Sequence, residues 1–363
     1  MNSTVDASKG PVTPPPAPSE SRGPGGGSPS PSLCYSLLSQ TKFYLSNSYW
    51  RYVLSLRQMD LRQLAALVAV AEQGSFSAAA DSLRTVQSNV SNHVARLEKE
   101  LGVQLVDRQS GSLTEEGQAV VDRARRINGE LDALVADVNA LRHEVVGTVR
   151  LGMIGTIARW LAPSLLAGLA DRHPKVHLIA HEGTTVTLDP QLANGRLDLA
   201  IVHLPFPGYD LTSRRLFDED VVMVVHPEHP LASREPLELS DLADLPLLLP
   251  APGTPFREEI DQAASKAGVV LTAKAELEGL RLIASLTFDG HGPSILPATA
   301  VPDRVARDWK RIPVSGLPRR QVGVAARRRA LPSAPARAAL SVLDDIIVAA
   351  VGTLPGLHPP SGS

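Results

Sequence analysis

The fold of this chain is decided by residues 74–102, which read GSFSAAADSLRTVQSNVSNHVARLEKELG. In the second half of this stretch, apolar residues recur at spacings of 4, 4, 3 and 4, which places them on one face of a helix. These residues are Val86, Val90, Val94, Leu97 and Leu101. The stretch therefore predicts an amphipathic helix that buries this face.

The opposite face of this helix carries short hydrogen-bonding groups and ends in the guanidinium of Arg96. Exposed helix faces usually carry Glu and Lys, whereas base edges and phosphates are bound by hydroxyl, amide and guanidinium groups. We therefore expect this helix to read DNA, with Arg96 at a phosphate or a purine edge. The expected DNA contacts on it are Thr85, Gln87, Ser88, Ser91, Asn92 and Arg96.

The first half of the stretch predicts a shorter helix, preceded by another at about 61–73. Ser75 or Ser77 can cap the short helix, and the alanines at 78–80 allow a close helix–helix contact. The break at Leu83–Thr85 is short enough to set the two helices of the stretch at a steep angle. This arrangement predicts a helix-turn-helix whose second helix enters the major groove. From pattern alone, the alternative is an ordinary all-α domain.

Residues 59–114 resemble the amino-terminal domain of LysR-type transcriptional regulators. The resemblance lies in short motifs that stand at the family's spacing, and it extends more loosely to about residue 355. These motifs are Gly74-Ser75-Phe76-Ser77, Ala79-Ala80, Gln87-Ser88, Val90-Ser91, Leu97-Glu98 and Leu101-Gly102. The resemblance implies a winged helix-turn-helix domain followed by an effector domain of two α/β lobes, built like a periplasmic binding protein.

The segment after the reading helix suggests a wing. Val103–Val106 and Leu113 are expected to form two short strands around a tight turn at 108–112. Members of the resembled family commonly carry a second basic residue near Gly111, and it is missing here. Arg108 is therefore the expected phosphate contact of the wing.

Composition sets limits on function. The chain has 363 residues, a formal net charge of −2 and a pI of about 6.6, so its bulk charge gives no sign of nucleic-acid binding. Residues 59–113 hold five Lys or Arg against six Asp or Glu, so DNA affinity must come from where the charges point. The only cysteine is Cys34, which excludes disulfides, cysteine-based zinc sites and the two-cysteine peroxide sensing of one branch of the resembled family.

Residues 1–58 precede the resemblance. Residues 1–30 are rich in Pro, Gly and Ser and cannot bury enough apolar surface to order themselves. Residues 32–56 lack the basic start and clean apolar centre of a signal peptide, and polar residues interrupt any membrane anchor. Members of the resembled family usually begin at a Met-Asp/Glu-Leu-x-x-Leu unit, which here starts at Met59. We expect 1–58 to reflect a misplaced translation start; a genuine disordered tail is the alternative.

A long helix is expected over about 115–145, capped by Thr114, with apolar residues alternating at spacings of 3 and 4. This heptad pattern is typical of a two-helix coiled coil, and a helix lying on its own domain is the alternative. The expected dimerisation contacts are Ala124, Ile127, Leu131, Leu134, Val138 and Leu141. Two-fold symmetry implies a pseudo-palindromic site in double-stranded DNA, and the expected assembly is a homodimer or a homotetramer.

From Gly147 onward the pattern alternates between strands and helices, which predicts parallel sheets buried on both faces. Two crossings of the chain, near 217–219 and 323–325, divide this region into lobes. The segments Ala193–Ile201 and Gly292–Pro297 match recurring segments of the resembled family. The expected boundaries are 1–58 for the extension, 59–114 for the DNA-binding domain, 115–146 for the linker helix, 147–355 for the effector domain (lobe I 147–218 and 325–355, lobe II 219–324) and 356–363 for a disordered tail.

The candidate effector site follows from strand ends. In open α/β sheets, ligands bind beyond the carboxyl ends of strands, where helix amino termini present free N–H groups. This rule selects Gly155-Thr156, Gly183-Thr184, His203 and Thr254. By resemblance, the three threonines and His203 fall where family members contact their inducers, and such groups suit a small polar or anionic ligand. Helix caps at Thr156 and Thr254, and a solvent-facing loop position for His203, are the alternatives.

No catalytic motif is present, since H-E-x-x-H, G-x-S-x-G and the phosphate-binding G-x-x-x-x-G-K-S/T are all missing. We expect no catalytic residue, no metal and no cofactor. The reading helix and the resemblance together imply a bacterial, cytoplasmic transcription regulator that responds to a small-molecule effector, with RNA polymerase as a further candidate partner and no membrane. Two alternatives stay open: a ligand-independent DNA-binding repressor and a free-standing small-molecule binding protein of periplasmic type.

Overall fold

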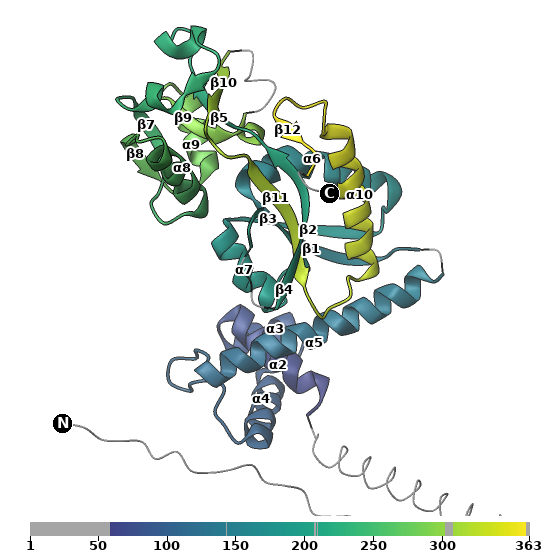
Figure 1. Cartoon of the computed structure of the whole chain (residues 1–363). Helices are drawn as coiled ribbons and strands as arrows, with labels where there is room; N and C mark the ends of the chain where they lie inside the picture. Colours follow the sequence, from purple (N-terminus) through teal and green to yellow (C-terminus); the bar gives the residue numbers. More distant parts are fainter. Residues whose placement is uncertain (1–58, 143, 207, 209, 302–307, 361–363) are drawn as a thin grey trace, which may run out of the picture. The chain divides into compact units, whose positions relative to one another are not determined.

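The computed structural model describes residues 59–142, 144–206, 208, 210–301 and 308–360 (Figure 1). The expectations for residues 1–58 lie outside this part of the chain. Among the residues described, no helix is both long and apolar enough to cross a membrane.

The amino-terminal domain is a helix-turn-helix, as predicted. Its helices are α2 (Leu61–Gln73), α3 (Phe76–Ser82) and α4 (Gln87–Leu101). Ser75 is the cap of α3, because its hydroxyl accepts a 3.2 Å hydrogen bond from the Ala78 N–H. Gly102 ends α4 in the left-handed region at a φ of 72°, where a residue with a side chain would be strained. These ends fix the length of the reading helix.

The inward face of α4 is shorter than its periodicity suggests. Val90, Val94 and Leu97 are buried in the domain core, whereas Val86 and Leu101 are exposed. Val86 is the N-cap, in extended conformation, and Leu101 is the last helical residue. The expectation that both point inward is wrong, because the two helix ends reach beyond the core.

The wing is a β-bridge between Val106 and Leu113 instead of the expected pair of strands. The backbone N–H groups of Leu105 and Val106 donate to the carboxylate of Glu98. Backbone hydrogen bonds still join the two segments, from the Asp107 N–H to the Ser112 carbonyl at 2.8 Å and from the Thr114 N–H to the Leu105 carbonyl at 3.0 Å. Glu98 therefore accepts from N–H groups that this bridge does not use.

The linker helix α5 runs from Glu115 to Ala140 and ends earlier than expected. Its first turn is capped by Thr114, whose hydroxyl accepts a 2.9 Å hydrogen bond from the Gly117 N–H. A Cβ at Gly117 would lie 2.0 Å from the Leu105 carbonyl oxygen, so only glycine allows this close approach. The beginning of α5 is therefore packed tightly onto the amino-terminal domain.

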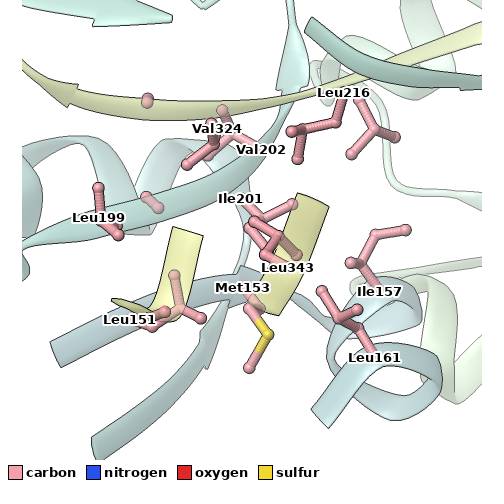
Figure 2. Packing of buried hydrophobic residues seen from close by; sticks show 14 of the residues in the cluster. Leu151, Met153, Ile157, Leu161, Leu199, Ile201, Val202, Leu216, Val324 and Leu343 are labelled. Atoms are coloured by element: carbon pink, nitrogen blue, oxygen red, sulfur yellow. The ribbon is translucent and has the colours of Figure 1, made fainter. Parts of the chain in front are cut away.

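Lobe I is built on a sheet with strand order β12-β4-β11-β3-β1-β2. Its strands are β1 (Gly147–Ile154), β2 (Val176–Gly183), β3 (Leu199–Leu204), β4 (Leu211–Glu219), β11 (Arg320–Arg327) and β12 (Leu357–His358). Its helices are α6 (Gly155–Arg172), α7 (Thr185–Ala193) and α10 (Ala334–Ala350). Figure 2 shows the core of this lobe, where Met153 and Ile201 from the sheet meet Ile157 of α6 and Leu343 of α10.

Lobe II is built on a second sheet, with strand order β6-β10-β5-β9-β7-β8. Its strands are β5 (Val221–Val225), β6 (Leu237–Glu238), β7 (Pro246–Pro250), β8 (Thr272–Leu277), β9 (Ser294–Pro297) and β10 (Lys310–Ser315). Its helices are α8 (Pro255–Lys266), α9 (Leu280–Phe288) and the short η1 (Pro230–Ser233), η2 (Leu239–Leu242) and η3 (Ala298–Ala300). Met223 of β5 packs with Ile260 of α8, and Val224 packs with Ile283 of α9. Alternate strand residues thus bury both faces of the sheet.

The sheets are mixed instead of parallel as predicted, since β11 runs antiparallel to both β3 and β4, and β5 runs antiparallel to β9 and β10. Because β11 begins at Arg320, the chain returns to lobe I before the expected crossing at 323–325. Leu357 and His358 pair with β4, so the expected disordered tail at 356–363 is wrong for these two residues.

Candidate functional site

Helix α4 presents the expected DNA-reading face to solvent. The exposed or partly exposed residues of this face are Thr85, Gln87, Ser88, Asn89, Ser91, Asn92 and Arg96. The Asn89 amide donates a 3.0 Å hydrogen bond to the Thr85 hydroxyl, which ties the helix to the preceding turn. No ion pair within the described residues engages Arg96. The face therefore offers amide, hydroxyl and guanidinium groups that base edges and phosphates can bind.

Glu98 of α4 holds the wing. Its carboxylate accepts hydrogen bonds from the Leu105 and Val106 N–H groups at 2.9 and 3.2 Å, and from the Arg108 guanidinium at 2.7 Å. Burial opposes ionisation, but these hydrogen bonds outweigh it and hold the pKa of Glu98 below its ordinary value. Arg108 also lies 5.6 Å from the centre of the Phe76 ring. The expected phosphate contact of Arg108 stays a prediction, and its guanidinium is already engaged within the domain.

Thr156 is buried, not exposed at a cleft mouth. It lies in the first turn of α6, whose N-cap is Ile154, so it is not the helix cap that the alternative proposed. Its hydroxyl accepts a 2.9 Å hydrogen bond from Arg320 Nη2, and only 2% of the residue is exposed. The protein itself therefore occupies the hydroxyl that was expected to bind an effector.

The other expected effector residues beside helix starts are also used by the fold. Thr184 caps α7 in a capping box with Thr187. Thr254 occupies the N-cap position of α8, but its hydroxyl donates to the Ala251 carbonyl at 2.9 Å. A Cβ at Gly155 would lie 2.7 Å from Glu182 Oε1, and one at Gly183 would lie 2.6 Å from Thr187 Oγ1. Effector contacts by these residues stay predictions.

Arg320, which no sequence motif marks, is the centre of a buried polar network. Its Nε donates a 2.7 Å hydrogen bond to Glu219 Oε1. The other oxygen of Glu219 accepts hydrogen bonds from the Thr299 N–H at 3.1 Å and the Thr299 hydroxyl at 2.7 Å. With the Thr156 contact, the network joins β4 and β11 to α6 of lobe I and η3 of lobe II. It therefore lies where both connecting segments pass between the lobes.

A groove of about 680 Å³ lies between the lobes beside His203. Its walls include Thr185, Asp189 and Phe206 of lobe I and Pro255, Glu258 and Glu259 of lobe II. His203 is buried within β3, so the alternative of a solvent-facing loop is wrong. The centre of its ring lies 6.4 Å from that of Phe256, and Phe256 in turn lies 5.7 Å from Arg320 Cζ. His203 is thus the expected effector residue that lines the groove, and Phe256 connects the groove to the buried network.

Helix α5 leaves an apolar stripe exposed. It consists of Ile127, Leu131, Leu134, Val135, Val138 and Leu141. Leu134 is 61% exposed and Leu141 is 82% exposed, so nothing within the described part of this chain covers the stripe. Ala124 was expected in it but is fully buried against the amino-terminal core, together with Val121. The assignment of Ala124 to the dimer contact is therefore wrong.

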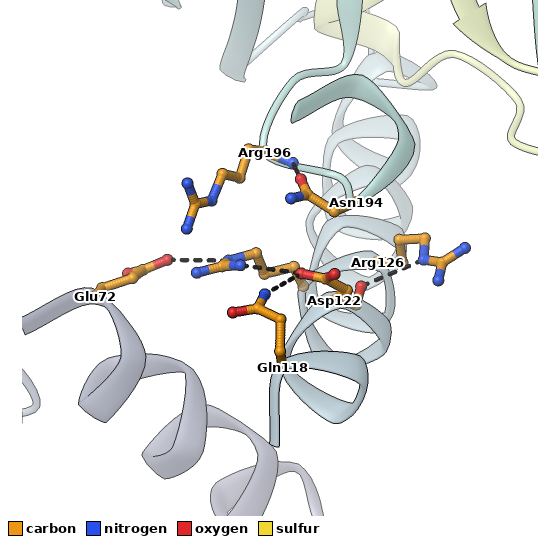
Figure 3. Close-up of polar contacts among 7 residues, drawn as sticks. Glu72, Gln118, Asp122, Arg126, Asn194 and Arg196 are labelled. Carbon is orange, nitrogen blue, oxygen red and sulfur yellow. Dashed lines mark hydrogen bonds and ion pairs between the residues drawn. The ribbon is translucent and has the colours of Figure 1, made fainter. Parts of the chain in front are cut away.

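Figure 3 shows how α5 is held against α2. The guanidinium of Arg125 in α5 pairs with both helices, with its Nε 3.5 Å from Glu72 and its Nη1 3.3 Å from Asp122. The Gln118 amide donates a further 2.8 Å hydrogen bond to Asp122. These contacts add polar bonds to the apolar contact between the linker helix and the amino-terminal domain.

The turn after α7 lies against the same helix. Gly195 has a φ of 82°, and a Cβ added there would lie 3.0 Å from Arg126 Cγ. The preceding Asn194 side chain accepts a 3.1 Å hydrogen bond from the Arg196 N–H, which shapes this turn (Figure 3). Burial, followed by repulsion from Arg123 and Arg327, lowers the pKa of Arg126. Lobe I therefore contacts the linker helix through a turn whose left-handed backbone favours glycine.

The two parts of the chain match two descriptions of one protein family. Residues 61–118 match "Bacterial regulatory helix-turn-helix protein, lysR family", and residues 142–346 match "LysR substrate binding domain". The chain belongs to the LysR family. It is a LysR-type DNA-binding transcriptional regulator with an effector-binding domain, which removes the alternative of a free-standing binding protein.

The relatives of this LysR-family chain include named regulators. The "Probable hydrogen peroxide-inducible genes activator" of Streptomyces viridosporus is 36% identical over 259 residues, which cover 70% of this chain and 82% of that protein. The "DNA-binding transcriptional dual regulator OxyR" of Escherichia coli K12 is 32% identical over 293 residues, covering 80% and 95%. The structure of a full-length OxyR variant from Pseudomonas aeruginosa has a TM-score of 0.65 at 28% identity, with the same coverage of 80% and 95%.

Proposed function

We propose that this LysR-type regulator switches transcription when a small-molecule effector occupies the groove beside His203, and that its single thiol does not sense peroxide. The names of its relatives refer to peroxide-inducible genes. The chain has one cysteine, Cys34, so it cannot form a disulfide within itself. Cys34 also precedes both segments that match the family. The observation that carries the proposal is a groove of about 680 Å³ with walls from both lobes.

The proposed signal passes from the groove to the segments that connect the lobes. Phe256 of α8 contacts His203 at the groove and Arg320 in the buried network, so a shift of α8 acts on both. A ligand changes the equilibrium between two lobe arrangements only by binding one of them better than the other. Closure of the lobes, like that of a periplasmic binding protein, would give the ligand a different affinity for the two arrangements. The turn at Gly195 would transmit the movement of lobe I to α5.

The proposed reader of the promoter is the exposed face of α4. Gln87, Ser88, Ser91 and Asn92 contact base edges, and Arg96 contacts a phosphate or a purine edge. Thr85 and Arg108 add contacts to the sugar-phosphate backbone of the DNA. The exposed amides and hydroxyls favour this assignment over a merely solvated face, since base edges and phosphates bind such groups.

The proposed dimer contact is a coiled coil formed by the apolar stripe of α5. Ile127, Leu131, Leu134, Val138 and Leu141 keep alternating spacings of 4 and 3, which is the seam of a two-helix coiled coil. An exposed apolar stripe of this length on a soluble helix favours a partner of the same kind. The resulting homodimer, or a homotetramer of two dimers, would place two reading helices on a pseudo-palindromic site.

The experiment begins with selection of binding sites from random DNA by the full chain, which we expect to yield a site with two-fold symmetry. DNase I footprints on that site are then compared with and without a low-molecular-mass extract of the source cells. We expect the extract to change the footprint of the wild type but not of Asp189→Trp, which fills the groove. An unchanged wild-type footprint would favour the ligand-independent repressor.

A second arm adds hydrogen peroxide to the wild type and to Cys34→Ser. We expect both footprints to remain unchanged. A peroxide-dependent change that disappears in Cys34→Ser would contradict the absence of thiol sensing.

A further inference from the structure

We infer that the effector of the groove beside His203 is an organic cation, a protonated amine or guanidinium carried on an apolar body. This inference rests on the proposed function, because it names the chemical class of ligand for the same groove. It differs from the anionic ligand that the threonines at the helix starts suggested.

The charged groups that line the groove favour a cation. Asp189 of α7 and Glu258 and Glu259 of α8 contribute three carboxylates, and the described lining includes no Lys or Arg. In the described part of the chain, no basic side chain pairs with Asp189 or Glu258. Carboxylates from two facing walls concentrate negative potential in the space between them, which attracts a cation and repels an anion.

Apolar side chains complete the same walls. Val186 of α7 is 64% exposed, and Leu204, Phe206 and Pro255 also line the groove. Exposed apolar surface beside a few charged groups is the usual composition of a small-molecule site. A ligand therefore gains most by placing an apolar body on these walls and its charge near the carboxylates.

The buried imidazole of His203 is a second observation that points to a ligand in the groove. Its side chain is 7% exposed, and among the described residues its Nε2 makes no hydrogen bond. Glu259 Oε1 lies 3.2 Å away but not in hydrogen-bonding direction. A buried polar atom without a hydrogen bond is costly, so such atoms are rare in folded proteins. A ligand cation that binds Glu259 can reorient its carboxylate and allow it to accept a hydrogen bond from Nε2.

The cationic groups nearby line an adjoining hollow of about 560 Å³, which shares Leu204, Pro205, Glu259 and Gln262 with the groove. They are Lys266 and Arg319, and Arg319 donates a 2.9 Å hydrogen bond to Asp220. Glu259 therefore faces cationic groups on one side, whereas Asp189 and Glu258 line only the groove, whose described lining holds no Lys or Arg. The end of the groove at Asp189 and Glu258 is the part that favours a cation.

The test compares ligands that share an apolar body and differ in charge. Binding of 2-phenylethylamine, 4-phenylbutylamine and 3-phenylpropionate to the full chain is measured by calorimetry. We expect both amines to saturate the protein and the carboxylate to bind at least about tenfold more weakly. In Asp189→Asn/Glu258→Gln, which keeps side-chain size, the amines should lose about tenfold in affinity. Glu228→Gln is the control, because this carboxylate in lobe II is 90% exposed and does not line the groove.

Three results would overturn the assignment: equal or tighter binding of the carboxylate, unchanged amine affinity in the double variant, or no saturable binding of either amine at millimolar concentration. The footprint response to the cell extract, measured on the same preparations, distinguishes this failure from failure of the proposed function. If only the cation assignment fails, the extract still changes the wild-type footprint but not that of Asp189→Trp, whereas failure of the proposed function leaves the wild-type footprint unchanged by the extract.

Discussion

Arg320 and Glu219 lie directly opposite each other in the register of β11 and β4, and their side chains are 2% and 0% exposed. Strand β4 ends at Glu219 and strand β11 begins at Arg320, and at both positions the chain passes between the lobes. Burying a charge costs several kcal/mol, and a partner with good geometry is needed to offset that cost. Thr156 binds this pair from lobe I and Thr299 binds it from lobe II. We call Arg320 and Glu219, with these two threonines, the joint between the lobes.

Glu219→Gln removes one charge of this joint and keeps its shape. We expect a loss of about 3–5 kcal/mol in the free energy of unfolding, because an uncompensated guanidinium stays buried. The double variant Glu219→Leu/Arg320→Met leaves no buried charge and should lose less. Urea denaturation measures both, and a single variant as stable as the wild type would show that the pair is not needed.

Thr156→Val replaces a hydroxyl by a methyl group of similar size. It leaves a buried N–H of Arg320 without an acceptor, so we expect a loss of about 1–3 kcal/mol in stability. Thr156→Ser keeps the hydroxyl and serves as the control. If Thr156→Val melts like the wild type but no longer responds to effector, the residue binds effector instead of supporting the joint.

Gln87→Ala and Asn92→Ala test the reading helix. Each should relax the sequence preference at one base pair per half-site, at a cost of about 1–3 kcal/mol, because an amide can distinguish one base edge from another. Arg96→Ala should weaken all sequences alike if Arg96 binds a phosphate, and it should then reduce the salt dependence of binding. Competition binding with altered sites measures the preference. Unchanged selectivity in the Gln87→Ala/Asn92→Ala variant would mean that another segment reads the bases.

Leu131→Glu/Leu134→Glu places charges in the apolar stripe of α5. We expect the assembly to dissociate to monomers in sedimentation, because the coiled-coil seam cannot bury these carboxylates. Leu166→Glu is the matched control, since Leu166 is 54% exposed on α6, outside the stripe. If both variants keep the wild-type mass, a different surface forms the dimer.

Glu98 predicts a pH dependence of stability. Its pKa is below the ordinary value of 4.5 in the folded protein, so the unfolded chain binds the proton more readily. The stabilisation from its hydrogen bonds is therefore complete above pH 4.5 and is lost as the pH falls through the folded pKa. Glu98→Gln should lose this contribution near neutral pH and differ less from the wild type in acid. Urea denaturation across a series of acidic pH values on both sides of 4.5 measures the difference, and a constant difference would contradict the prediction.

The sequence by itself determined the elements whose burial repeats locally. The helix expected at 61–73 is α2. The reading helix α4, the short helix α3 and most strands of the core were likewise predictable from the sequence. In each case, the spacing of apolar residues along a few turns reports which face is buried. The exposed stripe of α5 was also readable, apart from Ala124, because a heptad pattern does not reveal which part of the helix its own domain covers.

Only the tertiary structure decided the direction of β11, the joint at Arg320 and the charge of the groove. The polar sequence of β4, LTSRRLFDE, gives no clear alternation, since residues 212–214 are exposed while its end is buried by distant segments. Arg320 and Glu219 are 101 positions apart, and Asp189 and Glu258 come from different lobes. The threonines at helix starts suggested an anion because the dipole of a helix is a local property. The field inside a groove is the sum over all of its walls, and those walls meet only when the chain has folded.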